Sequence, residues 1–172
     1  LDNFEEKRQL GQNDSYLCSL IRSDSIQEFV QYMNKYSISH SSTISPSIFE
    51  ANDILARNRT TLIEYSAFYS AIQIFQYLKM NNAELTPSLW IYVIHSYNAE
   101  LIEFLVENNV PPPNGSYETC YKEAIKCHHN NLADYIYDNF LVHNSEDEND
   151  KNKIFNEELG EGLLATIFHY YN

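Results

Sequence analysis

The chain has 172 residues and a formal net charge of −13, from 11 basic and 24 acidic side chains. This length suffices for one domain with a sizeable core, and a hydrophobic share of 44% is normal for a folded protein. The negative charge disfavours nucleic acid and anionic membranes as partners, because both repel it, so a neutral or basic protein is the better fit. No apolar run approaches the roughly 20 residues that span a bilayer. Three cysteines do not make a disulfide scaffold, and we expect a cytoplasmic protein.

Residues 1–14 are interpreted as a lead-in, and residues 15–140 as a repeat region. In its first unit, Leu20-Ile21 is followed by the pattern Ser25-x-x-Glu28. In such a capping box, the serine side chain and the glutamate each satisfy a free backbone N–H at the start of a helix. This unit is therefore predicted to be a pair of helices, the second of which starts near Ser25.

The step from the first unit to the second is longer than the later steps. Within this insertion, Ser45-Pro46, Phe49 and Ile54-Leu55 indicate an extra helix. Because proline suits the first turn of a helix, we expect this helix to start near Pro46.

The second unit opens with the clearest helix start in the chain. Thr61 and Glu64 match a T-x-x-E capping box. The small pair Ser66-Ala67 lets another backbone approach closely, and the apolar spacing breaks and restarts at Ser70-Ala71. Asn81-Asn82 predicts the end, since asparagine tolerates the left-handed conformation that closes helices. The stretch is a helix, a turn and a second helix.

The same pattern recurs twice further along the chain. Ser88 stands in the place of Thr61 without a gap, and Thr119 stands at the next cap, with Ala124-Ile125 at the small pair. We therefore expect further helices to start in the region 86–88 and near Thr119. The apolar stripes are expected to be buried, among them Ile74, Trp90, Leu101, Leu105, Leu132 and Ile136.

Residues 141–156 contain the run NSEDENDKNK and are interpreted as a solvated acidic loop. A calcium loop built on Asp147, Asn149 and Glu158 fails, because Lys151 occupies a ligand position and the required glycine is missing. Residues 157–172 match only the first helix of another unit. Since a lone first helix leaves an apolar face uncovered, we expect the natural chain to continue beyond Asn172.

Units of about 30 residues that each form a helix pair are typical of a stacked solenoid. The pattern resembles the ankyrin repeat, whose consensus runs T-P-L-H-x-A-A, a short turn, I-V-x-L-L and a closing G-A-D. The likeness lies in Thr61 with Ser66-Ala67, in Ile74-Phe75, and in Asn82-Ala83-Glu84, which stands where Gly-Ala-Asp is usual. The Pro-Leu-His of the consensus is missing from every unit.

Taken as a whole, the region is similar to ankyrin-type domains of unknown function that are expanded in some protists. The resemblance implies an all-α, ankyrin-like helical-repeat solenoid of about four units plus a half unit, with an inserted helix between the first and second units.

The resemblance also implies a binding strip. In ankyrin-like stacks the first helix of each unit lines the concave face, and the residues flanking its small pair point outward. Four of the six residues at these positions are aromatic or imidazole side chains, which are enriched at protein interfaces. Carried over unit by unit, the positions are Tyr65, Phe68, Tyr92, His95, Glu123 and Lys126.

Nothing in the sequence predicts catalysis, because it has no phosphate-cradling loop, nucleophile elbow or H-E-x-x-H pair. The most reactive-looking cluster is Cys120, Cys127, His128 and His129. Its last three residues are consecutive and point around a helix, so one zinc ion cannot collect them. We interpret Cys127 as packed against a neighbouring unit and both histidines as lying in an exposed turn, and we expect no metal and no cofactor.

The sequence therefore predicts a non-catalytic module that binds a protein partner through the concave face and hairpin loops. The alternative is a structural subunit of a large cytoskeletal or multi-protein assembly. The sequence names no partner, because solenoid surfaces specify partners through scattered side chains and not through a motif.

Overall fold

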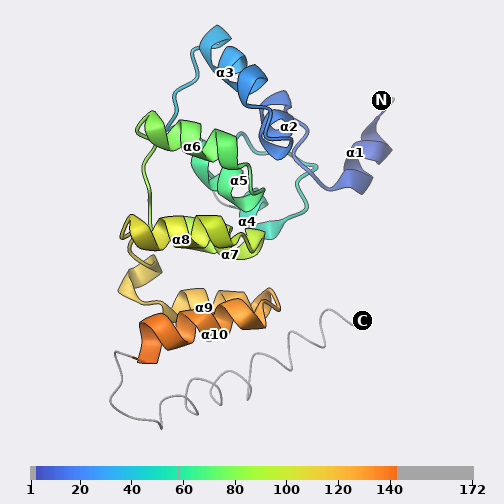
Figure 1. Cartoon of the computed structure of the whole chain (residues 1–172). Coiled ribbons are helices and arrows are strands. Elements are labelled where there is room, and N and C mark those ends of the chain that lie inside the picture. The colour runs from blue at the N-terminus through green and yellow to red at the C-terminus, as the bar shows by residue number, and fades with distance from the viewer. Residues whose placement is uncertain (1–2, 58, 143–172) are drawn as a thin grey trace.

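The computed structural model describes residues 3–57 and 59–142 (Figure 1). Within these ranges the chain is all-helical, as expected, and its only β-type pairing is an isolated bridge between Thr43 and Thr61. Two further short helical segments are a 3-10 helix at Pro113–Gly115 and a π-helical turn at Tyr137–Leu141. The α-helices are α1 (Phe4–Leu10), α2 (Tyr16–Arg22), α3 (Ile26–Lys35), α4 (Asp53–Arg57), α5 (Leu62–Phe68), α6 (Ile72–Met80), α7 (Leu89–Ser96), α8 (Ala99–Glu107), α9 (Glu118–Lys126) and α10 (Asn130–Ile136).

Eight of these helices form consecutive pairs: α2 with α3, α5 with α6, α7 with α8, and α9 with α10. Each pair contacts the next through its first helix, in the order α2, α5, α7 and α9 (Figure 1). The second helices also meet, since α3 contacts α6 and the ring of Phe75 on α6 lies edge-on to that of Phe104 on α8. The described chain is thus a row of helix pairs.

The predicted start of α5 is confirmed in atomic detail. The Thr61 hydroxyl accepts a hydrogen bond from the backbone N–H of Glu64, and the Glu64 carboxylate accepts one from the backbone N–H of Thr61. The helix start expected in the region 86–88 is also found, because Ser88 precedes the first residue of α7. The start of α5 follows from local side-chain chemistry at a free helix end, whereas the Ser88 hydroxyl makes no cap and donates to the Glu64 carboxylate.

Helices do start near Ser25 and near Thr119, as expected, but three finer details of the predicted starts are wrong. Ser25 precedes α3 but does not cap it, because its hydroxyl pairs with the hydroxyl of Ser23. The inserted helix starts at Asp53 and not near Pro46, since the Asn52 side chain accepts the first free N–H groups of α4. Thr119 lies inside the first turn of α9, which begins at Glu118.

The turns between paired helices share one backbone feature. A residue with positive φ lies in every such turn, although none of the four is glycine. In three of the four turns the next backbone N–H binds the carbonyl five residues earlier, which is the Schellman arrangement that closes a helix. The spacings between Ser70, Tyr97 and His128 equal the shifts that align Thr61 with Ser88 and Ser88 with Thr119. The four residues are Asp24 (47°), Ser70 (54°), Tyr97 (52°) and His128 (59°).

The apolar stripes form one core that runs along the row of helix pairs. All six residues named above as core are buried, as predicted. The largest of them, Trp90, is fully buried and donates its indole N–H to the backbone carbonyl of Val110, 2.9 Å away. This bond satisfies the one polar atom that the ring brings into the core.

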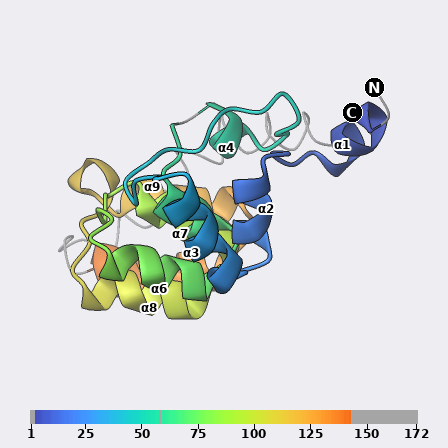
Figure 2. The same ribbon diagram turned by 90° about the horizontal axis from the view of Figure 1, so that it is seen from above.

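The segment 39–60, between α3 and α5, contains α4 and lies on the opposite side of the molecule from α6 and α8 (Figure 2). The N-terminal segment holds it there. The side-chain amide of Asn13 donates to the carbonyl of Ser45 at 2.8 Å, and its backbone N–H donates to the Glu50 carboxylate at 3.1 Å. The insertion therefore covers part of the side of the molecule on which the first helices lie.

The predicted acidic loop, apart from residues 141–142, and the predicted partial unit at 157–172 lie outside the described residues. In the part of the chain that is described, no helix has the length and apolar character needed to cross a membrane.

Candidate functional site

The six residues predicted to form a binding strip divide into two groups. Tyr65 and Tyr92 are 1% and 3% exposed, so the expectation that they face outward is wrong. The remaining four, Phe68, His95, Glu123 and Lys126, lie near the C-terminal ends of the first helices α5, α7 and α9. The strip is consequently shorter than predicted and is displaced toward the turns between paired helices.

Tyr65 and Tyr92 are buried because Tyr65 reaches the first helix of the preceding unit and Tyr92 reaches the insertion. The guanidinium of Arg22, on α2, donates to the Tyr65 hydroxyl at 2.8 Å. The Tyr92 hydroxyl lies 3.3 Å from that of Thr60, at the end of the insertion. Burial raises the pKa of Tyr65 far above its usual range, so its hydroxyl stays protonated. These tyrosines hold the first helices to the N-terminal unit and to the insertion.

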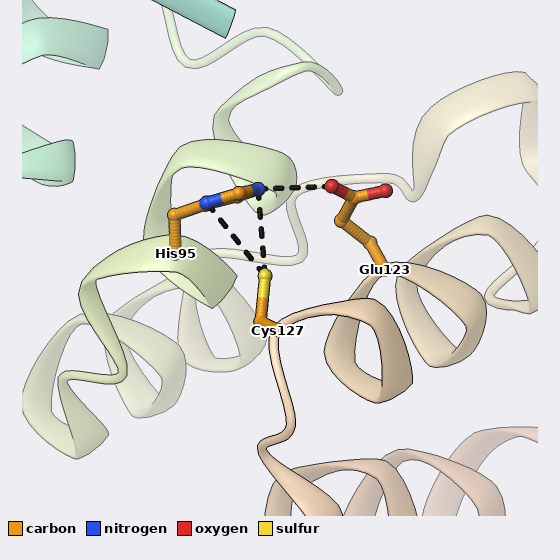
Figure 3. A group of neighbouring side chains, drawn as sticks. All are labelled: His95, Glu123 and Cys127. Atoms are coloured by element: carbon orange, nitrogen blue, oxygen red, sulfur yellow. Dashed lines mark hydrogen bonds and ion pairs between the residues drawn. The ribbon is translucent and has the colours of Figure 1, made fainter. Parts of the chain in front are cut away.

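The other four predicted residues meet one another. The ring of Phe68 stacks on that of His95, with 5.7 Å between centroids. The imidazole Nε2 of His95 then lies 2.9 Å from Oε1 of Glu123 (Figure 3). Lys126 lies one turn along α9, with its ammonium 3.5 Å from the second carboxylate oxygen of Glu123. The four residues thus form a continuous line of contacts from α5 through α7 to α9.

Cys127 joins this line, at the end of α9. Its sulfur lies 3.5 Å from Nε2 and 3.6 Å from Nδ1 of His95 (Figure 3). The interpretation that Cys127 packs against a neighbouring unit is therefore confirmed. His128 is exposed in the turn, as predicted, whereas His129 is half-buried with its ring stacked on Tyr97 at 4.3 Å.

The contacts of His95 change its protonation. Burial lowers the pKa of His95, but its contacts with Cys127 and Glu123 outweigh burial and raise that pKa to about 9. The hydrogen bond from His95 lowers the pKa of Glu123, against the opposing effect of burial, and the Lys126 charge lowers it further. At neutral pH the pair is an imidazolium and a carboxylate, each about one-fifth exposed.

Among the described residues, His95, Glu123 and Cys127 also form a group that can hold a metal ion. One ligand atom from each residue lies within 4.8 Å of the others. The cysteine–histidine cluster singled out in the sequence does not form such a group. Cys120 is buried in the core, and burial raises its pKa to about 12, which keeps it a thiol.

The link between His95 and Cys127 was missed because Cys127 was weighed as a metal ligand only together with Cys120, His128 and His129. A signal did exist. The shift that aligns Ser88 with Thr119 also places His95 opposite Lys126, one residue before Cys127. Since equivalent positions of successive units lie side by side in a stack, this alignment brings His95 and Cys127 close together.

Comparisons with known proteins give no assignment: no protein-family model, no curated protein and no solved structure matches this chain.

Proposed function

We propose that this chain is an ankyrin-like helical solenoid that binds another protein and has no catalytic role. The row of helix pairs supports the proposal, since each pair contacts the next through its first helix and the turns share one backbone conformation. Ser66, Ala67 and Ala124 are fully buried on first helices, as the small positions of stacked units require.

The binding surface we propose is the turn-edge surface, which comprises Phe68, His95, Tyr97, Glu123 and Lys126. The observation that carries the proposal is that side chains from α5, α7 and α9 form one continuous line there. Tyr97 is 48% exposed, and the Lys126 side chain is 63% exposed, so both are available to a partner. An exposed aromatic ring beside polar groups is a common anchor at protein interfaces.

The partner is expected to be a neutral or basic protein. The chain carries a net charge of −13, which favours cationic partners over a long range. Three exposed glutamates add to this along α8, at positions that share one side of the helix: Glu100, Glu103 and Glu107. A cytoplasmic location is part of the proposal, and it is supported by the unpaired thiols of Cys18 and Cys120.

Affinity capture followed by mass spectrometry tests this function, with variants that leave the fold intact. The test variant is Tyr97→Asn combined with Lys126→Glu, because asparagine tolerates the left-handed backbone at residue 97. The control is Met80→Ala, since Met80 is 79% exposed at the end of α6. We expect a partner that both the unaltered chain and the control recover and that the test variant loses. Equal recovery by all three proteins would refute the turn-edge surface.

The same experiment addresses the structural-subunit alternative. An interaction module exchanges its partner and runs as a small species during size-exclusion chromatography. A structural subunit instead elutes with one large particle, and dilution does not release it. That second outcome would favour the alternative over a reversible binding module.

A further inference from the structure

His95, Glu123 and Cys127 bring three kinds of metal ligand together from two helix pairs. His95 comes from the last turn of α7, Glu123 from α9, and Cys127 from the end of α9. The carboxylate oxygen and the sulfur approach the same ring nitrogen, Nε2, at 2.9 Å and 3.5 Å, from different directions (Figure 3). Such convergence is unusual on a helix surface, where i, i+4 spacing alone brings Glu123 and Cys127 together.

We propose that these three residues bind a divalent transition-metal ion and that a fourth coordination position is open to water. The combination of thiolate, imidazole and carboxylate ligands favours zinc. Thiolate, imidazole and carboxylate are the three side chains that zinc takes in proteins. Calcium and magnesium are excluded by the same set, because they require oxygen ligands. The site goes beyond the proposed function and does not depend on it.

The three ligand atoms lie close enough together for one ion to bind them after rotation of the Glu123 and Cys127 side chains. With Zn–N and Zn–S distances of about 2.0 and 2.3 Å, the nitrogen and sulfur ligands of a tetrahedral zinc are roughly 3.5 Å apart. His95 Nε2 and Cys127 Sγ are 3.5 Å apart. Nitrogen and oxygen ligands of such an ion are roughly 3.3 Å apart, whereas His95 Nε2 and Glu123 Oε1 are 2.9 Å apart. A small rotation of the Glu123 side chain opens that gap.

The surroundings hold the ligands in place. Phe68 stacks on the imidazole with an interplanar angle of 21°, which fixes the plane in which the ring nitrogen presents its lone pair. Lys126 lies 3.5 Å from Oε2 of Glu123, so the oxygen that does not face His95 has its own partner. Fixing both the ring plane and the carboxylate in this way raises the affinity of metal sites.

A cysteine–histidine–glutamate catalytic triad uses the same residue types, but the distances oppose it. In a triad the nucleophile bonds to one ring nitrogen and the acid to the other. The Cys127 sulfur is almost equally far from both nitrogens of His95, so it is not directed at either one. A metal ion on the axis of the Nε2 lone pair needs the Cys127 side chain to rotate until its sulfur lies about 2.3 Å from the ion. Glu123 and Cys127 would then both bind on the Nε2 side of the ring, where a triad needs them on different nitrogens.

The ion has a structural consequence for the row of helix pairs. α7 and α9 are the first helices of the third and fourth pairs, and they contact each other directly. An ion held by His95 on one side and by Glu123 and Cys127 on the other clamps this contact. Metal that binds only the folded chain also stabilises it by mass action.

Cobalt provides a direct test, because Co²⁺ bound to a thiolate gives a near-ultraviolet charge-transfer band and tetrahedral Co²⁺ gives intense visible bands. The full chain is prepared without a polyhistidine tag, treated with a chelator, and titrated with Co²⁺ and then Zn²⁺. We expect both sets of bands to saturate at one equivalent, zinc to displace them, and one equivalent of zinc to raise the melting temperature.

Variants make the assignment specific. Cys127→Ser is expected to abolish the charge-transfer band, and Glu123→Gln to weaken zinc binding by more than about tenfold, the smallest loss seen when groups behind the ligands are altered. The matched control is His128→Gln, an exposed residue beside Cys127, which should bind as the unaltered chain does. Circular dichroism confirms that each variant is folded. The proposal is overturned if no charge-transfer band forms, if the band survives Cys127→Ser, or if His128→Gln loses it.

Discussion

The carboxylate of Asp24, in the turn between α2 and α3, caps the start of α6 in the next helix pair. Its two oxygens accept hydrogen bonds from the backbone N–H groups of Gln73 and Ile74, each 3.0 Å away. The residue that precedes α6 is Ala71, whose side chain provides no cap of its own. A cap from a neighbouring unit thus replaces the local one, and it also fixes how the first two helix pairs sit together.

Replacing Asp24 tests this cap. Asp24→Ala removes both hydrogen bonds and places alanine at a φ of 47°, so we expect it to lower the free energy of unfolding by about 1–2 kcal/mol in urea denaturation. Asp24→Asn keeps an oxygen acceptor and a residue that tolerates this backbone, and it should cost less than half as much. Equal losses for the two variants would mean that the negative charge, and not the cap, is what stabilises the turn.

The core assignment is tested by Leu105 and Tyr92, both buried. Leu105→Ala should cost about 2–5 kcal/mol through lost burial and the cavity left behind, and Tyr92→Ala about 3–5 kcal/mol. The loss expected for Tyr92→Ala is large because Tyr92 is buried, whereas the outward position predicted from the sequence would have made it small. Met80→Ala, at an exposed residue, should stay within about 0.5 kcal/mol. A Tyr92→Ala variant as stable as Met80→Ala would show that Tyr92 is at the surface after all.

The His95–Glu123 pair makes stability depend on pH in the metal-free protein. Because the folded pKa of His95, about 9, exceeds the ordinary histidine value of 6.5, its contribution to stability is complete below about pH 6.5 and is lost as the pH rises through 9. Because the pKa of Glu123 is lowered from 4.5, its contribution is present above that pH and is lost on further acidification. Other titrating or charged groups nearby are Lys126, Cys127, His128 and His129.

The measurement is urea denaturation from pH 6 to 10 with a chelator present, on the unaltered chain and on His95→Gln. The difference in unfolding free energy between the two should shrink by on the order of 2–3 kcal/mol across this range. The matching difference for His128→Gln should be flat. A His95→Gln difference that does not change with pH would mean that His95 is neutral in the folded protein at pH 7.

The positive φ angles in the turns predict a stabilising substitution. Ser70 has a φ of 54° in the turn between α5 and α6, a conformation that glycine adopts freely and serine does not. Ser70→Gly should therefore raise the melting temperature, corresponding to about 0.5–1 kcal/mol. Ser19→Gly, inside α2, should lower it, because glycine weakens a helix interior. If both changes destabilise, Ser70 is not held in the left-handed conformation.

Elements that depend on neighbours along the chain could be predicted from the sequence. The capping box of Thr61 and Glu64, the break at Ser70-Ala71 and the apolar stripes of the later units all rest on contacts within a few residues, so spacing alone reveals them. The same spacing placed Phe68, His95, Glu123 and Lys126 on successive first helices. Their meeting in one line follows from stacking equivalent positions.

Which of those positions are exposed, and which residues contact them, depends on the packing of the helices. Tyr65 and Tyr92 occupy the predicted register, yet Arg22 and the insertion at 39–60 cover them, and nothing local to either tyrosine encodes that cover. Cys127 meets His95 across two helix pairs for the same reason. Side-chain burial and ligand geometry depend on contacts between residues far apart in the chain, which the packing of whole helices sets and which no pattern of neighbouring residues specifies.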